Sequence, residues 1–180
     1  MTTPHLLGIS GSLRSASTNT KLLLEAARLF GPNTFVQADL QMPLYDGDLE
    51  AEHGVPAPAQ RLAKQIAEAD AVLISTPEYN KAPPGVLKNA LDWVSRVDGK
   101  PWAGKPVAVM SAASGRAGGE RAQMVLRGYM VPFRPRILQG PEIHLAASSK
   151  QFDEDGRLTG ELYVKELTEL MQALRAEVGR

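Results

Sequence analysis

The sequence contains no cysteine. Disulfide bonds, thiol nucleophiles, thiolate metal sites and iron–sulfur clusters are therefore excluded. The motif G-x-S-x-G, which presents a nucleophilic serine, is also missing. The three histidines, His5, His53 and His144, are too scattered to predict a metal site or a catalytic triad. We expect an intracellular, cytoplasmic protein with no metal site and no catalytic side chain of its own.

The chain also lacks an excess of charge of either sign, since 20 Lys and Arg balance 20 Asp and Glu. Nucleic-acid binding normally draws on a basic surface, so we predict no nucleic-acid partner. No apolar run approaches the roughly 18 residues that a membrane span needs, and we predict no membrane association. The first residues lack a basic segment followed by a long apolar core, so we expect no signal peptide.

Apolar runs typical of strands alternate with patterns typical of helices. Strands are predicted at 5–10, 34–39, 71–76, 106–113 and 134–139, and helices at 18–30, 56–69, 84–97, 118–131 and 160–179. This alternation indicates an α/β fold whose parallel sheet is covered on both faces. We predict a single domain over residues 1–180 with a doubly wound five-stranded sheet in the order 2-1-3-4-5.

Ligands of such folds bind where loops leave the carboxyl ends of the central strands. The corresponding loops here are 10–18, 76–84 and 111–119. The residue types in these loops therefore decide which functions are compatible with the sequence.

The first loop and the helix that follows it are rich in small hydrogen-bond donors. A helix beginning near Thr18 would add its free N–H groups and the positive end of its dipole, and this combination suits a phosphate monoester. Because neither G-x-x-x-x-G-K-[ST] nor G-x-G-x-x-G is present, a triphosphate or a tightly held dinucleotide is disfavoured, which leaves a mononucleotide such as FMN. The donors are the hydroxyls of Ser10, Ser12, Ser15, Ser17, Thr18 and Thr20, the Asn19 amide and the Arg14 guanidinium.

The second and third loops carry groups suited to a flat heterocycle. Tyr79 is an aromatic residue at the carboxyl end of a strand, and its neighbours Glu78 and Asn80 can hydrogen-bond a ring edge or fix the loop. In the third loop, Ser111 and Ser114 supply hydroxyls, while glycines at 115, 118 and 119 would let backbone amides face the ring.

The chain resembles the NADPH-dependent FMN reductase family, flavodoxin-like enzymes that include the soluble quinone and chromate reductases. The resemblance runs from about residue 5 to 142. It rests on "GSLRSASTN" (11–19), "PLYDGDLE" (43–50), "TPEYNKAPPGVLKNALDW" (76–93) and "SGRAGGERAQMVLR" (114–127).

The resemblance implies non-covalently bound FMN, NADPH or NADH as co-substrate, and a homodimer or homotetramer. It also assigns contacts with the cofactor. The interpretation of the hydroxyl-rich first loop adds Ser10 and Thr18 to these contacts. The implied contacts are Ser12, Arg14, Ser17 and Asn19 for the phosphate, Pro77, Glu78, Tyr79 and Asn80 for the ribityl chain and isoalloxazine, and Ser111, Ser114 and Gly115 for the other edge of the ring.

We therefore predict an FMN-dependent NAD(P)H oxidoreductase that passes a hydride from nicotinamide to FMN and then reduces quinones, free flavin or similar small acceptors. The segment "NKAPPG" (80–85) departs from the family pattern, and Lys81 within it could add positive charge at the mouth of the site. Arg116 could meet the phosphates of the dinucleotide. Two alternatives stay open. One is a flavodoxin-type FMN electron carrier without substrate turnover, and the other is a phosphate-binding or interaction module that does not bind flavin.

Overall fold

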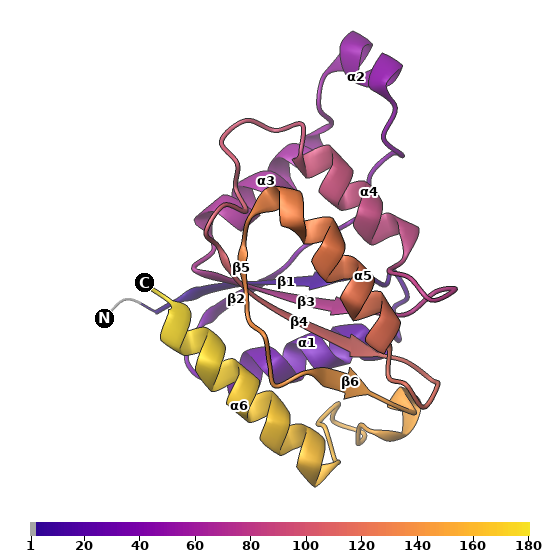
Figure 1. Cartoon of the computed structure of the whole chain (residues 1–180), viewed down its shortest axis with the longest axis vertical. Coiled ribbons are helices and arrows are strands. Elements are labelled where there is room, and N and C mark those ends of the chain that lie inside the picture. Colours follow the sequence, from indigo (N-terminus) through magenta and orange to yellow (C-terminus); the bar gives the residue numbers. More distant parts are fainter. Residues whose placement is uncertain (1–2) are drawn as a thin grey trace.

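The computed structural model describes residues 3–180, and its centre is a parallel β-sheet (Figure 1). The strands follow the order β2-β1-β3-β4-β5, and β6 also pairs with β4. This finding confirms the predicted α/β fold and the order 2-1-3-4-5. The strands are β1 (His5–Ser10), β2 (Thr34–Gln37), β3 (Ala71–Thr76), β4 (Pro106–Ala112), β5 (Arg136–Ile137) and β6 (Ile143–Leu145).

The outer edge beyond β4 is built from two short strands. β5 pairs with Pro106 and Val107 at the start of β4, whereas β6 pairs with Met110 to Ala112 at its end. The predicted strand over 134–139 is therefore wrong in extent, and β6 was not predicted. Pro141 lies between the two strands and has no N–H to donate to a sheet, which is consistent with the interruption.

Helices cover both faces of the sheet, as predicted, with α1 and α6 on one side and α3, α4 and α5 on the other (Figure 1). Among residues 3–180, none of the helices is both long and apolar enough to cross a membrane. The predicted helices are observed with ends shifted by a few residues. They are α1 (Thr18–Leu29), α3 (Ala57–Glu68), α4 (Gly85–Val94), α5 (Glu120–Met130) and α6 (Glu161–Glu177), with the short 3₁₀ helices η1 (Val131–Phe133) and η2 (Ser148–Lys150).

The segment between the predicted strand 34–39 and the predicted helix 56–69 contains a helix that the sequence did not indicate. This helix, α2 (Gly47–His53), projects away from the rest of the molecule (Figure 1). The side chain of Asp46 caps it by accepting a hydrogen bond from the N–H of Asp48 at 2.9 Å. No residue of α2 is buried, so it has no apolar stripe from which helical spacing could be read.

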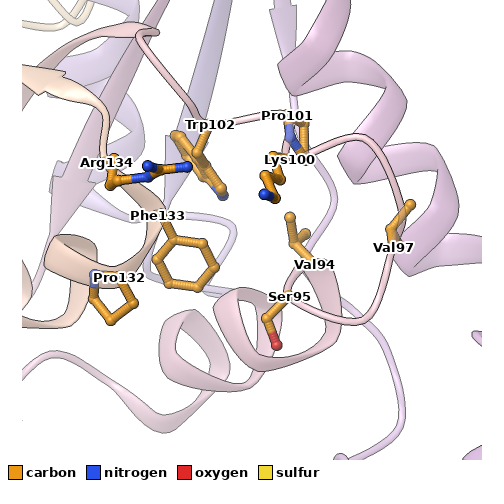
Figure 2. A pocket seen from close by; sticks show the side chains of 9 residues that line it. All are labelled: Val94, Ser95, Val97, Lys100, Pro101, Trp102, Pro132, Phe133 and Arg134. Atoms are coloured by element: carbon orange, nitrogen blue, oxygen red, sulfur yellow. The ribbon is translucent and has the colours of Figure 1, made fainter.

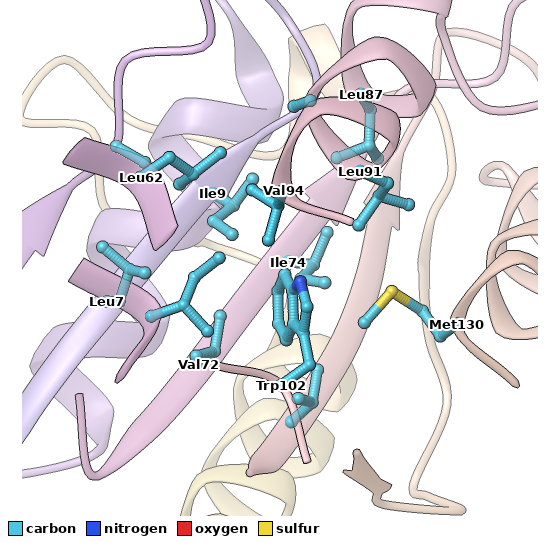
Figure 3. Close-up of a cluster of buried hydrophobic side chains, with 14 of the residues drawn as sticks. Leu7, Ile9, Leu62, Val72, Ile74, Leu87, Leu91, Val94, Trp102 and Met130 are labelled. Carbon is cyan, nitrogen blue, oxygen red and sulfur yellow. The ribbon is translucent and has the colours of Figure 1, made fainter. Parts of the chain in front are cut away.

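The core consists of two layers because successive residues of a strand point to opposite faces. Val72 and Ile74 of β3 pack with α3 and α4, where Leu62 and Leu91 belong to the same cluster (Figure 3). The remaining apolar residues of β3 face α1 and α6. Every residue of β3 is buried, which places the carboxyl end of this strand in the middle of the sheet.

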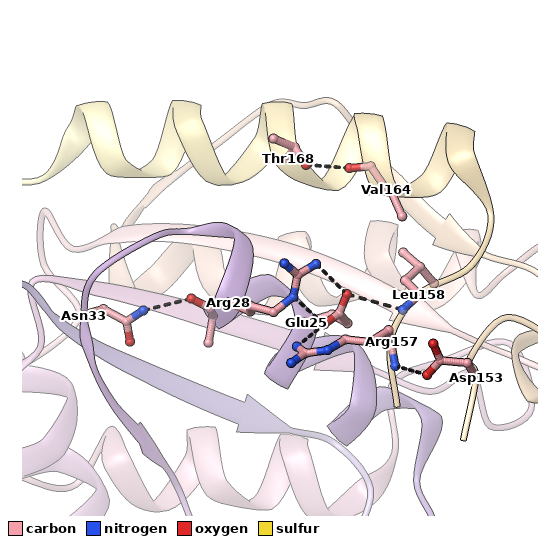
Figure 4. Close-up of polar contacts among 9 residues, drawn as sticks. Glu25, Arg28, Asn33, Asp153, Arg157, Leu158, Val164 and Thr168 are labelled. Atoms are coloured by element: carbon pink, nitrogen blue, oxygen red, sulfur yellow. Dashed lines mark hydrogen bonds and ion pairs between the residues drawn. The ribbon is translucent and has the colours of Figure 1, made fainter. Parts of the chain in front are cut away.

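A buried carboxylate joins α1 to the segment that leads into α6 (Figure 4). Glu25 is only 1% exposed and accepts hydrogen bonds from Arg28 at 2.8 and 3.0 Å, Arg157 at 3.0 Å and the N–H of Leu158 at 3.3 Å. Burial acts to raise the pKa of Glu25, but these hydrogen bonds outweigh it and hold the pKa below its ordinary value. The ionised carboxylate is therefore the form that the fold stabilises.

Candidate functional site

The three loops predicted to carry function meet at one edge of the sheet. Ser10 pairs in register with Ser75, and Thr76 pairs with Ser111, so the ends of β1, β3 and β4 lie side by side. A cavity of about 260 Å³ opens there. It is lined by Ser12, Arg14, Ala16, Ser17, Thr18, Asn19, Pro77, Glu78, Tyr79, Ala112, Ala113, Ser114, Ser148 and Ser149.

Most of the residues predicted to bind a cofactor line this cavity, and a few lie outside its lining. Those that line it are Ser12, Arg14, Ser17, Thr18, Asn19, Pro77, Glu78, Tyr79 and Ser114. Those outside it are Ser10, Asn80, Ser111 and Gly115. For both sets, contacts with a cofactor stay predictions. Several of these side chains make hydrogen bonds within the protein, which limits the atoms that can contact a ligand.

The start of α1 has the donors that a phosphate requires. Ser17 is the N-cap, and its Oγ accepts a hydrogen bond from the N–H of Thr20 at 3.3 Å, which leaves the hydroxyl proton free to donate elsewhere. The N–H groups of Thr18 and Asn19 have no acceptor within the helix because they lie in its first turn. No acidic residue in that turn offsets the positive end of the helix dipole.

Arg14 supplies a cation beside these donors, and together with Ser12, Ser17 and the first N–H groups of α1 it forms what we call the phosphate cradle. Its side chain is exposed and, among residues 3–180, takes part in no ion pair or side-chain hydrogen bond. An unpaired guanidinium beside a helix N-terminus and serine hydroxyls matches a dianionic phosphate in charge and in hydrogen-bond donors. The residues present therefore fit the terminal phosphate of a mononucleotide.

The side chain of Asn19 is used for a different purpose. Its Nδ2 donates to the carbonyl of Ala112 at 2.9 Å, and its Oδ1 accepts from the N–H of Ala112 at 3.0 Å and from Ser75 Oγ at 2.8 Å. Asn19 is 3% exposed. The amide thus joins the start of α1 to β3 and β4, so only the backbone N–H of this residue is open to a ligand.

Ser10 and Ser111 also direct their hydroxyls into the protein. Ser10 Oγ donates to the carbonyl of Ser12 at 3.3 Å and accepts from Thr20 Oγ1 at 3.1 Å. Ser111 Oγ donates to the carbonyl of Gly118 at 2.6 Å and accepts from Gln123 Nε2 at 2.8 Å. These two hydroxyls shape the first and third loops from inside.

The second loop forms a tight hairpin. Tyr79 and Ala82 exchange both backbone hydrogen bonds, at 2.9 and 3.1 Å, and the two residues between them have positive φ angles, 52° at Asn80 and 66° at Lys81. Two successive positive φ angles define a type I′ turn. Asn80 and Lys81 therefore form the exposed tip, while Tyr79, 49% exposed, stands at the wall of the cavity.

Glu78 fixes this hairpin to the rest of the fold. Its carboxylate accepts a hydrogen bond from the N–H of Ala122, in the first turn of α5, at 3.2 Å. Of the two roles that the sequence left open for Glu78, the structure shows the one that holds the loop in place.

Two serines that the sequence did not single out, Ser148 and Ser149, complete the cavity. The third loop pairs with the segment after β6: Ala113 donates to Leu145 at 3.0 Å, and Ser148 donates to Ala113 at 3.0 Å. Ser148 Oγ then lies 2.9 Å from Thr18 Oγ1. The pairing of β6 with β4 places these serines at the site. Because β6 was not predicted, nothing in the sequence indicated that they would lie there.

Comparison with known proteins is consistent with this site. Residues 4–150 match the family described as NADPH-dependent FMN reductase. The chain is 42% identical to an NAD(P)H-dependent FMN reductase of Pseudomonas aeruginosa, an alignment that covers 97% of this chain and 95% of the relative. It is also 42% identical to a quinone reductase of Escherichia coli (strain K12), over 77% of this chain and 75% of the relative.

A solved structure extends the similarity to three dimensions. The flavoenzyme NAD(P)H:(acceptor) oxidoreductase of Paracoccus denitrificans superposes with a TM-score of 0.87 at 32% identity and covers 97% of both chains. A match over most of the sequence and an agreement in fold over nearly all of it lead to the same assignment. The chain belongs to the NADPH-dependent FMN reductase family.

Proposed function

We propose that the chain is an FMN-dependent NAD(P)H oxidoreductase that reduces quinones, free flavin or similar small acceptors. The observation that carries this proposal is the convergence of a phosphate cradle, an exposed aromatic side chain and a set of serine hydroxyls in one cavity at the carboxyl ends of β1, β3 and β4. The names of the relatives, FMN reductase and quinone reductase, support the same cofactor and the same class of acceptor.

Different side chains would hold different parts of FMN. Ser12, Arg14 and Ser17 bind the terminal phosphate together with the first N–H groups of α1. Tyr79 and Pro77 would hold the ribityl chain and the ring, and Ser114 would supply a hydroxyl to the ring's other edge. When bound, FMN supplies the two-electron chemistry that couples hydride donation by NAD(P)H to reduction of the acceptor.

The protein's contribution is to hold these groups rigidly. The amide of Asn19 keeps the first loop in register with β3 and β4, and Glu78 keeps the Tyr79 hairpin against α5. Both side chains line the cavity but use polar atoms for contacts within the protein, and the exposed side of the site stays open to a nicotinamide and then to an acceptor. A donor and an acceptor would bind there in turn, and the proton that reduction of a quinone takes up in addition to the hydride would come from water at this open side.

We further propose a homo-oligomer, either a dimer or a tetramer, located in the cytoplasm where NAD(P)H is available. The projecting segment around α2 supports self-association because it exposes apolar side chains: Leu44 is 78% exposed, Leu49 45% and Tyr45 40%. Sedimentation velocity tests this point. Leu44→Asp should shift the protein toward monomer. A wild-type protein that sediments as a monomer would contradict the proposal.

The test of the function is a steady-state assay of NADPH and NADH oxidation with benzoquinone as acceptor, with and without added FMN. We expect turnover that depends on FMN. FMN binding without turnover would favour an electron carrier, and a colourless protein that leaves FMN fluorescence unquenched would favour a module that does not bind flavin.

A further inference from the structure

A second cavity, of about 350 Å³, lies at the opposite end of the sheet from the proposed flavin site. Its walls come from the end of α4, the loop that leads into β4, and η1 (Figure 2). Val94, Trp102, Pro132 and Phe133 make it largely apolar, and Lys100 and Arg134 stand at its edge. The flavin site borders Ala112, where β4 ends, whereas this cavity borders the residues that precede Pro106, where β4 begins.

Lys100 and Arg134 are cations without partners. In the portion of the chain that the structure covers, neither makes an ion pair or a side-chain hydrogen bond. Both side chains are exposed, and Figure 2 shows both among the residues that surround the cavity. The edge of this apolar cavity is therefore positively charged and open to an anion.

The backbone at these two cations is unusual. Lys100 has a φ of 50° and Arg134 a φ of 56°, in the left-handed region that favours glycine. Their carbonyl groups are held by hydrogen bonds from the N–H groups of Ala103 and Gly104, both at 3.0 Å. Residues with strained backbone conformations often occur at functional sites. Here the two strained residues each place a positively charged side chain beside the cavity.

Trp102 provides an independent indication of a ligand. Its side chain is 1% exposed, yet its Nε1–H has no hydrogen-bond acceptor in residues 3–180. A buried donor without an acceptor is costly and uncommon. Figure 2 shows the nitrogen-bearing edge of the indole turned toward Lys100 and the space between the lining residues. An acceptor atom of a molecule in the cavity would satisfy this donor.

We propose that this cavity binds a small aromatic carboxylate. The partly exposed Phe133 ring and Pro132 give it an apolar wall against which a ring can pack. The Phe133 ring is itself supported by the buried Trp102, in an edge-to-face contact with centroids 6.5 Å apart and planes at 62°. The carboxylate lies toward Lys100 and Arg134, and one of its oxygen atoms accepts the hydrogen bond from Trp102. The volume suits a ligand of one or two fused rings.

The site can be tested by NMR because the chain has only two tryptophans, Trp93 and Trp102. The Trp93 Nε1–H already donates to the carbonyl of Pro43 at 2.8 Å, so its signal is an internal reference. We expect 1-naphthoate, added to the ¹⁵N-labelled protein saturated with FMN, to shift the Trp102 indole signal saturably and to leave that of Trp93 in place. The uncharged 1-naphthalenemethanol should bind about tenfold more weakly.

Variants test the two cations. Lys100→Gln and Arg134→Gln should each weaken naphthoate binding by about fivefold to tenfold. The matched control, Lys165→Gln, removes an exposed cation from α6 on the other face of the sheet and should bind as the wild type does. Both cavity variants alter exposed side chains and should fold normally, which the unchanged dispersion of the spectrum would show.

Several outcomes would overturn the proposal. They are the absence of a Trp102 shift at millimolar naphthoate, equal binding of the uncharged analogue, and unchanged binding by both cavity variants. Release of FMN by naphthoate, seen as a change in flavin absorption, would place the ligand at the flavin site instead. A Trp102 signal that responds to protein dilution but not to naphthoate would indicate a second copy of the chain as the occupant.

Discussion

Asn19 and Ala112 exchange two hydrogen bonds, at 2.9 and 3.0 Å, between the first turn of α1 and the last residue of β4. This pair sets the position of the phosphate cradle relative to the third loop, because it joins the first turn of α1 to the residue from which that loop leaves β4. The Ser75 hydroxyl, donating to the same amide at 2.8 Å, adds the end of β3 to the arrangement.

We predict that Asn19→Ala lowers the free energy of unfolding by about 3 kcal/mol, because it removes three hydrogen bonds and leaves the buried N–H and carbonyl of Ala112 without partners. Denaturant unfolding monitored by circular dichroism measures the change. Asn33→Ala is the matched control, since the Asn33 side chain donates only to carbonyls near the end of α1 and is partly exposed. It should cost about 1 kcal/mol, and equal costs for the two variants would contradict the special role of Asn19.

Glu25 should make stability depend on pH. Its pKa in the folded protein lies below the ordinary value of 4.5, because the hydrogen bonds from Arg28, Arg157 and the Leu158 N–H outweigh the effect of burial. Between the two values the unfolded chain binds more protons than the folded one. The free energy of unfolding therefore falls as the pH drops below 4.5 toward the folded-state pKa, and the contribution of Glu25 is complete only above this window.

Glu25→Gln should lower the free energy of unfolding at pH 7 by about 1.5–3 kcal/mol and flatten its dependence on pH below 4.5. Urea unfolding at a series of pH values measures both effects. The control is Asp92→Asn, which breaks the exposed pair with Lys88 on α4 and should cost about 0.5 kcal/mol. A Glu25→Gln variant as acid-sensitive as the wild type would show that other carboxylates cause the dependence.

Lys81 should be replaceable by glycine with a gain in stability. Its φ of 66° is a left-handed conformation that glycine adopts without steric cost, and Asn-Gly is the preferred sequence of a type I′ turn. We expect Lys81→Gly to raise the free energy of unfolding by about 0.5 kcal/mol after allowing for the greater entropy of glycine in the unfolded chain.

Lys81→Gln separates backbone strain from charge, because it keeps the strain and removes the charge. It should leave stability unchanged, and any increase in its KM for NADPH would report the charge alone. A loss of stability in Lys81→Gly would mean that the lysine side chain holds the turn through contacts not evident from its exposed position.

Most of the fold could be predicted because strands such as β3, with six buried residues, and long amphipathic helices have local patterns. The division of the outer edge into β5 and β6 could not be predicted, because β6 has only three residues and its place depends on pairing with β4. The helix α2 was missed for a similar reason, since its stability rests on a polar cap and not on a buried stripe.

The location of the candidate site was readable from the order of strands and loops, but the orientation of its side chains was not. Whether Asn19 or Ser111 faces a ligand or the interior depends on tertiary partners, Ala112 in one case and Gly118 in the other. Ser148 enters the site only through its hydrogen bonds with Ala113 and Thr18, which join residues distant in the sequence.

Arg14→Ala should lower the affinity for FMN about tenfold or more, because a charge-assisted contact with the phosphate contributes about 1.5–3 kcal/mol. Quenching of flavin fluorescence measures the dissociation constant. The control is Arg116→Ala, which removes an exposed arginine of the third loop that does not line the cavity. An equal loss in both variants would point to a general effect of positive charge.

The most direct measurement compares the dissociation constants of FMN and riboflavin, which differ only in the phosphate, for the wild type and for Arg14→Ala. If the first turn of α1 and Arg14 hold the phosphate, the wild type will bind FMN at least about a hundredfold more tightly than riboflavin, and Arg14→Ala will reduce that ratio about tenfold by weakening FMN alone. Equal affinities of the wild type for the two flavins would contradict the claim.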